Sequence, residues 1–167
     1  MSGRVVVLAA LLLTGTGAVS RTPSHPVAQP AGHGRTIFSC RLRDGKIVTV
    51  AGGGGRFVYR YGNARRPELA IVGTVADRNL FKMVAVHGGD WDIQLRFVSG
   101  DYSYIVHSFP RNEIVDNVAT SGLVVFRAGK RILDRSCSRW AEIAFENSDD
   151  MFALPDIPEG APSAWGD

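Results

Sequence analysis

Alternating apolar and polar residues mark the stretch from Asp90 to Phe109. Trp, Ile, Leu and Phe occupy every second position of residues 91–97, and residues 102–107 alternate in the same way. A period of two predicts strands with one buried face and one solvated face. Ser99-Gly100-Asp101 separates the two runs and is typical of a turn, because glycine adopts positive φ at little cost. We therefore expect a β-hairpin, with a solvated face that includes Asp92, Gln94, Arg96, Ser103 and His107.

Similar short runs occur on both sides of this hairpin, which alone would be marginally stable. Turns such as Asp44-Gly45, Gly52–Gly55 and Ala128-Gly129 separate them. The further strands that we predict cover residues 36–42, 46–51, 56–61, 68–72, 80–86, 121–127 and 131–137. The β domain, residues 36–137, should be all-β: a single antiparallel barrel or sandwich of about eight or nine short strands.

The pattern changes after Cys137. Trp140, Ile143 and Ala144 have helical spacing, which predicts one short helix that continues to Asn147. The C-terminal helix and arm should span residues 138–157, with the arm packing through Met151, Phe152, Leu154 and Ile157. Residues 158–167 are rich in proline and are expected to form a loose tail.

The first residues match a secretory signal peptide. Arg4 precedes the unbroken apolar run Val5–Leu13, and Ala18-Val19-Ser20 offers small residues for cleavage. The run is too short to span a bilayer, and no cysteine follows it as a lipid attachment site. We expect a signal peptide at residues 1–20, a flexible linker at residues 21–35, and a periplasmic or secreted mature protein without a stable membrane anchor.

Charge and cysteine content bear on two further properties, nucleic-acid binding and disulfide formation. The formal net charge is +3 and the basic residues are scattered, so the sequence does not favour nucleic-acid binding. Cys40 and Cys137 are the two cysteines, and an even number in an exported chain favours a disulfide. Both lie on the terminal predicted strands, so the bond would join the seam of a closed sheet.

Catalytic motifs are absent from the sequence. It contains no Gly-x-Ser-x-Gly and no histidine pair with zinc spacing. Ser103 and His107 share a strand face but lie about 13 Å apart at roughly 3.3 Å per residue, too far for a direct hydrogen bond. We expect a surface histidine there, and a solvated strand edge at Asp90 and Asp92. No catalytic residue, metal or cofactor is predicted. The aromatic residues should form core, with some available for binding: Tyr59, Tyr61, Trp91, Phe97, Tyr102 and Tyr104.

One set of residues resembles a group of small exported proteins of Gram-negative bacteria. The resemblance covers about residues 38–137 and implies export and a common fold, but no activity. Members often have a cysteine where this chain has Ala51. The residues that carry it are Ser39-Cys40, Asp44-Gly45-Lys46, Tyr59-Arg60-Tyr61-Gly62, Glu68-Leu69, Arg96-Phe97, Gly100, Tyr102, Tyr104, Gly122-Leu123-Val124-Val125, Gly129-Lys130 and Cys137.

The architecture is also similar to that of the periplasmic inhibitors of c-type lysozyme, which are small β-barrels with an early and a late cysteine. Their Ser-Gly motif would correspond to Ser121-Gly122, and their later lysine to Lys130. The tyrosine that follows their Ser-Gly is replaced by Val124 and Val125. This likeness implies Ser121, Gly122 and Lys130 as partner-binding residues.

The sequence leaves two classes of function open. The first is a non-catalytic binding module, with a periplasmic lysozyme-type enzyme as one candidate partner. The second is a small periplasmic hydrolase with an unrecognised site. An exposed Ser121 or Lys130 would favour the first, whereas a deep pocket that joins His87 or His107 to a carboxylate would favour the second.

Overall fold

The computed structural model describes residues 34–87, 89–110, 118–145 and 147–165, so the predicted leader and most of the predicted linker lie outside the described residues. The described chain is an all-β sandwich of two antiparallel sheets, as expected. The first sheet contains β1 (Thr36–Arg41), β2 (Ile47–Gly53), β3 (Arg56–Asn63) and β4 (Arg66–Thr74). The second contains β5 (Leu80–His87), β6 (Asp90–Ser99), β7 (Tyr102–Phe109), β8 (Thr120–Arg127) and β9 (Lys130–Ser136).

The strands follow one another as an antiparallel meander in each sheet, and most predicted strand ends are confirmed to within a few residues. The turns have the chemistry that the sequence indicated. Gly45 and Gly100 have φ of 87° and 56°, and the Asp44 carboxylate accepts a hydrogen bond from the Lys46 amide at 3.0 Å. These turns fix the register of the strands that they join.

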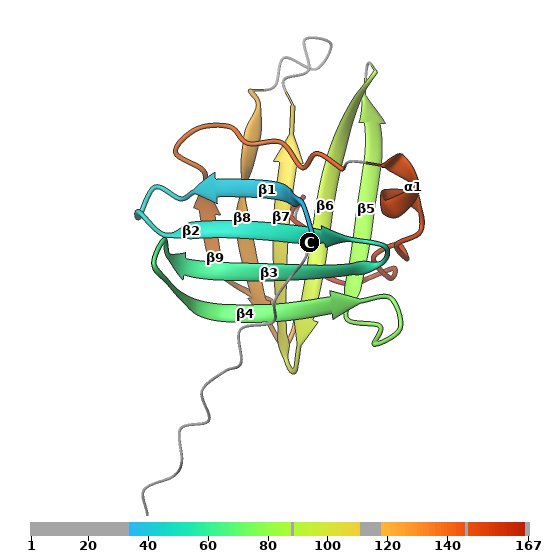
Figure 1. Ribbon diagram of the computed structural model, residues 1–167, viewed down its shortest axis with the longest axis horizontal. Coiled ribbons are helices and arrows are strands. Elements are labelled where there is room, and N and C mark those ends of the chain that lie inside the picture. The colour runs from blue at the N-terminus through green and yellow to red at the C-terminus, as the bar shows by residue number, and fades with distance from the viewer. Residues whose placement is uncertain (1–33, 88, 111–117, 146, 166–167) are drawn as a thin grey trace, which may run out of the picture.

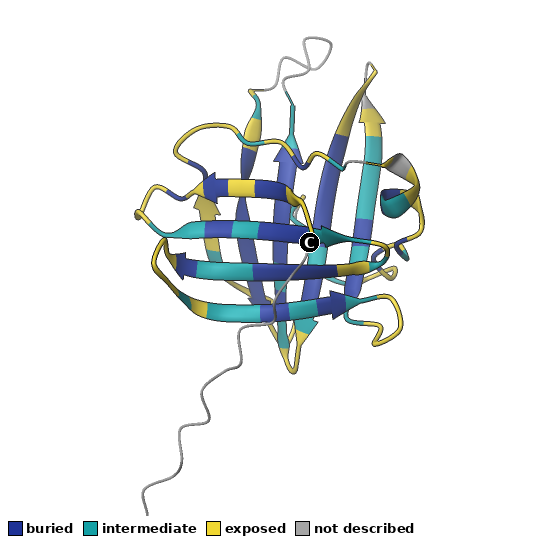
Figure 2. Ribbon diagram, in the orientation of Figure 1, coloured by how far each residue is buried: buried dark blue, intermediate teal, exposed yellow. Residues whose placement is uncertain are grey.

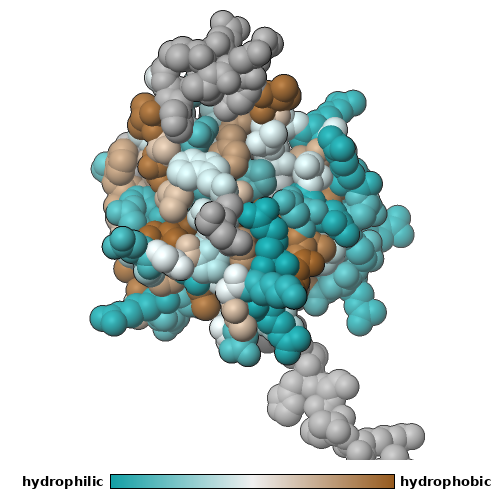
Figure 3. All heavy atoms as spheres, turned by 180° about the vertical axis from the view of Figure 1, so that it is seen from behind, coloured by the Kyte–Doolittle hydropathy of each residue, from teal (hydrophilic) through white to brown (hydrophobic). Residues whose placement is uncertain are grey.

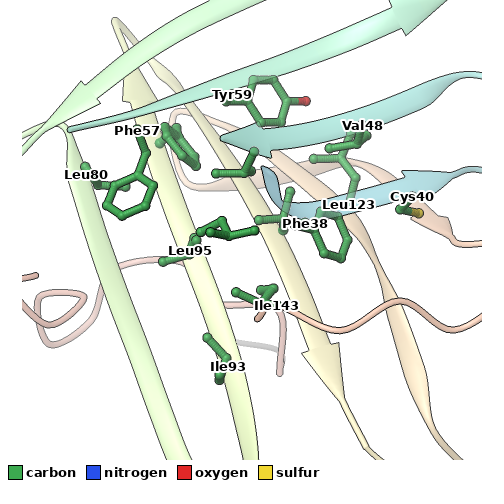
Figure 4. Close-up of a cluster of buried hydrophobic side chains, with 14 of the residues drawn as sticks. Phe38, Cys40, Val48, Phe57, Tyr59, Leu80, Ile93, Leu95, Leu123 and Ile143 are labelled. Carbon is green, nitrogen blue, oxygen red and sulfur yellow. The ribbon is translucent and has the colours of Figure 1, made fainter. Parts of the chain in front are cut away.

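The two sheets pack face to face, and the strands of one run across those of the other (Figure 1). Buried segments concentrate where the two sheets face each other (Figure 2), and every second residue of β6 from Ile93 to Phe97 belongs to the core between them. Figure 4 shows side chains from both sheets meeting there. Phe38, Val48, Tyr59, Leu80, Leu95 and Leu123 are among the buried residues of this core. The alternation seen in the sequence is thus the alternation between core and outer surface.

The first and last strands meet at one corner. Leu42 and Cys137 form an isolated antiparallel bridge, and Ser138 donates a backbone hydrogen bond to the Arg41 carbonyl at 2.7 Å. The predicted disulfide is confirmed here, because Cys40 and Cys137 are bonded with their Cα atoms 5.7 Å apart. The sheets are otherwise separate, so the fold is a sandwich rather than a closed barrel.

The helix predicted around Trp140 is wrong. Residues 138–145 form an extended strap across one end of the sandwich, and the short helix α1 (Ser148–Phe152) begins after it, with Asn147 as its N-cap (Figure 1). In the strap, Ala141, Ile143 and Phe145 pack on the core while Trp140 is exposed. The inward positions therefore follow a period of two, and a helix-like spacing of three apolar residues was misleading.

The C-terminal segment covers the edge and the outer face of the second sheet. Lys82 on the edge strand β5 donates its backbone N–H to the Pro155 carbonyl, and Ile157 donates to the Lys82 carbonyl. Further on, Ala164 donates to Gln94 Oε1 at 2.7 Å, and Trp165 packs on Phe109. The tail expected to be loose therefore makes specific contacts up to residue 165.

This covering corrects the prediction of a solvated face on β6 and β7. Asp92, Gln94, Ser103 and His107 are all buried. Ile105, Val124 and Phe126 form a second small apolar cluster on that face, with Ala164 packed against it. Seen from behind, this side shows hydrophobic atoms in separate patches between hydrophilic ones (Figure 3). The sequence period was right, but both faces of the hairpin are dry because a distant segment returns to cover one of them.

Candidate functional site

An open pocket of about 340 Å³ lies where β3 and β4 face β7, β8 and β9. We call it the tyrosine pocket. Its lining residues come from five strands, at a corner where the two sheets are not joined. Several residues that carry the resemblance to small exported proteins come together here. The lining residues are Tyr59, Tyr61, Glu68, Leu69, Tyr102, Tyr104, Leu123, Val125, Ile132 and Leu133.

Three tyrosine rings form a connected wall of this pocket. The rings of Tyr102 and Tyr104 are stacked, with centroids 6.0 Å apart, and Tyr104 lies 5.5 Å from Tyr59. The guanidinium of Arg127 lies over the ring of Tyr102 at 5.5 Å, outside the pocket lining. Such contacts hold rings in place, so the wall is formed before any ligand arrives.

The tyrosine hydroxyls are neutral hydrogen-bonding groups. Burial raises the pKa of Tyr59, Tyr61 and Tyr104 above the ordinary value. The Tyr59 hydroxyl is buried and has no hydrogen-bond partner within the described part of the chain. A buried hydroxyl without a partner is costly, so this position beside the pocket favours a polar atom that could pair with it.

A charged pair stands at the mouth of the tyrosine pocket. Lys46 forms an ion pair and hydrogen bond with the Glu68 carboxylate, which also accepts a hydrogen bond from Asn63 at 3.1 Å. The hydrogen bond to Glu68 raises the pKa of Lys46. The Glu68 carboxylate thus accepts hydrogen bonds from two side chains at the rim, so its charge is already paired there.

The sequence predicted the tyrosines to be core residues with some available for binding, but it did not indicate which of them would line a pocket. Tyr59 and Phe97 are fully buried core residues, and Tyr59 also lines the pocket together with the partly buried Tyr61, Tyr102 and Tyr104. Leu69 was singled out only by the resemblance, and Ile132 and Leu133 were not identified. Their place on predicted strands does not show that they line a pocket, because the register between β3 and β4, and between β8 and β9, brings them to this corner.

The residues proposed for partner binding do not come together. Ser121 is buried near the start of β8, and its Oγ accepts a hydrogen bond from the Ala141 amide at 2.9 Å. Gly122 is packed so closely that a Cβ there would lie 2.4 Å from the Arg135 carbonyl oxygen. Lys130 is exposed at the opposite end of the β8–β9 hairpin. Ser121 and Gly122 thus have structural contacts, and only Lys130 is available on the surface.

His107 is not the surface histidine that we expected. It is only 8% exposed, stacks on Phe109 with ring centroids 4.7 Å apart, and has a buried Nδ1 without a partner among the described residues. Burial lowers its pKa to about 4. Ser103, on the same face, instead accepts hydrogen bonds from Arg96. The side chain of His87 lies outside the described part of the structure.

Within the described residues, no helix is long and apolar enough to cross a membrane, and no group of three or more His, Cys, Asp or Glu residues could hold a metal ion. No family model, curated protein or solved structure matches the chain.

Proposed function

We propose that this protein is an exported, non-catalytic binding module that holds an apolar group of a small ligand in the tyrosine pocket. The observation that carries the proposal is the 340 Å³ pocket with its tyrosine wall. Ligand sites are mostly apolar concave surfaces with a few placed polar groups, and their volumes begin near roughly 300 Å³. The pocket is about twice the size of the roughly 150 Å³ cavity known to hold benzene, which suits a two-ring or short acyl group.

The chemistry of the lining supports binding of a neutral group. Burial raises the pKa of Tyr59, Tyr61 and Tyr104 further above the ordinary tyrosine value near 10, so these three hydroxyls carry no charge at neutral pH. Glu68, the one carboxylate among the described lining residues, is paired with Lys46 at the rim. No lysine, arginine or histidine occurs among the described lining residues, so the lining offers an anionic group no cation, whereas a neutral polar atom could accept a hydrogen bond from a tyrosine hydroxyl.

Export is part of the proposal. The leader pattern of residues 1–20 and the Cys40–Cys137 disulfide both support a periplasmic or secreted location, because such bonds persist in oxidising compartments. In such a location the ligand would be a molecule that reaches the cell envelope.

Binding of N-phenyl-1-naphthylamine, a neutral two-ring dye that brightens in apolar surroundings, tests the pocket. We expect saturable binding by the purified, oxidised protein. Leu133→Arg places a charge at the partly buried wall and should weaken binding at least about tenfold, since burying an unpaired charge is costly. Val86→Arg is the matched control, because Val86 is exposed and outside the pocket. Binding that is not saturable, or that Leu133→Arg leaves unchanged, would refute the assignment.

Inhibition of a lysozyme-type enzyme stays a narrower prediction, now limited to the exposed turn at Lys130. Ser121 and Gly122 could reach a partner only if the strap and the β8–β9 pairing opened. An activity assay of c-type lysozyme with increasing amounts of the protein tests it, with Lys130→Ala as the variant. Inhibition that Lys130→Ala abolishes would add a protein partner to the proposed function.

A further inference from the structure

A second cleft lies at the other end of β7 from the tyrosine pocket. Tyr102 and Tyr104 near the start of β7 line the tyrosine pocket, whereas Ser108 at its end and Pro110 beyond it line this cleft. Its volume is about 570 Å³, and the strap of residues 138–145 forms one wall. We call it the tryptophan cleft, because two of the three tryptophans of the chain line it, Trp91 and Trp140.

Both tryptophans are unusually open to solvent for such large apolar side chains. Trp91 is 39% exposed and Trp140 is 45% exposed, while Ile93, Ile143 and Met151 beneath them are buried. Trp91 is held from one side by Phe152, with ring centroids 5.7 Å apart. Exposed aromatic side chains gathered over a concave surface are typical of a site that binds something.

The polar groups of the tryptophan cleft are negatively charged. Asp90 and Glu142 both line it and are exposed, and neither forms an ion pair with another described residue. No lysine, arginine or histidine occurs among the described lining residues. The two carboxylates lie on different elements, one at the start of β6 and one in the strap, so the fold brings them to one cleft from distant parts of the chain.

We propose that the tryptophan cleft binds an organic cation, namely a trimethylammonium group of the kind found in choline. Such a group is large, apolar on its surface and weakly hydrated, and its charge is attracted to the face of a tryptophan ring. Carboxylates add a second attraction without requiring directional hydrogen bonds. A neutral ligand would leave the two negative charges without a counterpart, and an anion would be repelled by them.

The decisive comparison is between choline and 3,3-dimethyl-1-butanol, in which a carbon atom replaces the charged nitrogen. Tryptophan fluorescence of the purified protein reports binding. We expect choline to quench it saturably and to bind at least about tenfold more tightly than the neutral analogue, with an affinity that falls as salt is added. Equal binding of the two compounds, or tighter binding of an N-acetylglucosamine oligosaccharide, would overturn the proposal.

Variants locate the site. The double variant Asp90→Asn, Glu142→Gln keeps the shape of the cleft and should weaken choline binding about fivefold or more, and Trp140→Leu should weaken it similarly. Trp165→Leu is the control, because Trp165 lies on Phe109 at the outer face of the second sheet and does not line the cleft. An effect of Trp165→Leu as large as that of Trp140→Leu would place the cation elsewhere and refute the assignment.

The trimethylammonium group could belong to a free molecule or to a lipid headgroup, and the same protein distinguishes them. Saturable binding of free choline assigns a soluble ligand. Co-sedimentation with phosphatidylcholine vesicles but not with phosphatidylglycerol vesicles, if free choline does not bind, assigns a headgroup. Failure with both sources overturns the proposal. The tyrosine pocket is independent, because the dye assay reports on a different set of residues.

Discussion

His107 couples the stability of the sandwich to pH. Its imidazole is buried on the outer face of the second sheet, and burial lowers its pKa to about 4, whereas an exposed histidine has a pKa near 6.5. Between these values the unfolded chain binds a proton that the folded chain does not. The free energy of unfolding therefore rises with pH from about 4 to about 6.5 and is unaffected by this group outside that window.

Replacing the histidine by a group that does not titrate should remove this dependence. We expect the wild-type protein to lose roughly 2–3 kcal/mol more stability than His107→Gln when the pH falls from 7 to 4. Urea unfolding at several pH values measures the difference between the two proteins, so contributions from carboxylates cancel. Parallel stability curves for the two proteins would show that the pKa of His107 does not change on folding.

The strap is the element that closes one end of the sandwich, and two buried serines anchor it. Ser108 Oγ accepts a hydrogen bond from the Ile143 amide at 3.1 Å, and Ser121 Oγ accepts one from Ala141 at 2.9 Å. Both serines are buried, and Ile143 is fully so, while Ala141 is partly open to water. An amide left without a partner costs more where water cannot replace the serine.

Removing these hydroxyl groups should therefore have unequal effects. Ser108→Ala is expected to lower the free energy of unfolding by about 1–3 kcal/mol, and Ser121→Ala by less. Ser39→Ala, an exposed position on β1, is the control and should change stability by less than about 0.5 kcal/mol. Urea denaturation gives the values. A larger loss for Ser121→Ala than for Ser108→Ala would contradict this account of the strap.

Elements that depend on local patterning were predictable from the sequence. The hairpin of β6 and β7 follows from alternation around Ser99-Gly100-Asp101, and the turn at Asp44-Gly45 follows from glycine's access to positive φ. The strap was misread because Trp140, Ile143 and Ala144 are also compatible with a helix. The extended conformation depends on contacts between distant parts of the chain, because Ser108 and Ser121 accept hydrogen bonds from backbone amides of the strap.

The candidate sites were less predictable than the strands, because each depends on strand pairing between distant residues. The tyrosines of β3 and β7 were identified as aromatic residues, but only the packing of the two sheets shows that Tyr61 and Tyr104 share a pocket with Leu133. In the same way, Glu142 is far from Asp90 in the sequence, and the two line the same cleft only because the strap passes beside the start of β6. Burial of His107 needed the returning C-terminal segment, which no local period could indicate.

At the scale of the whole molecule, the two sheets are fastened at one corner and open at another. The Leu42–Cys137 bridge and the disulfide join the first sheet to the end of the second, whereas the tyrosine pocket occupies a corner where the sheets do not pair. A binding site at an unpaired corner can open without breaking strand hydrogen bonds. The fastened corner then keeps the two sheets in their relative position while a ligand enters.

Loss of the disulfide should weaken this fastening. Cys40 and Cys137 are 97 positions apart, and a cross-link that closes a loop of that size contributes about 4–5 kcal/mol in the chain-entropy model. The reduced chain would keep the Leu42–Cys137 bridge and its backbone hydrogen bonds, but these close a long loop without covalent help. We therefore expect the double variant Cys40→Ser, Cys137→Ser to be less stable by about 2–5 kcal/mol.

Urea denaturation of the variant and of the oxidised wild-type protein measures this loss, and the reduced wild-type protein is the matched control. The reduced wild type should behave like the variant, because both lack the cross-link and differ only by sulfur and oxygen at two positions. Hydrogen exchange adds a local test: the amide of Ser138, which donates to Arg41 across the seam, should exchange faster in the variant, since that corner opens first. A variant as stable as the oxidised protein, with unchanged exchange at Ser138, would mean that packing alone holds the seam.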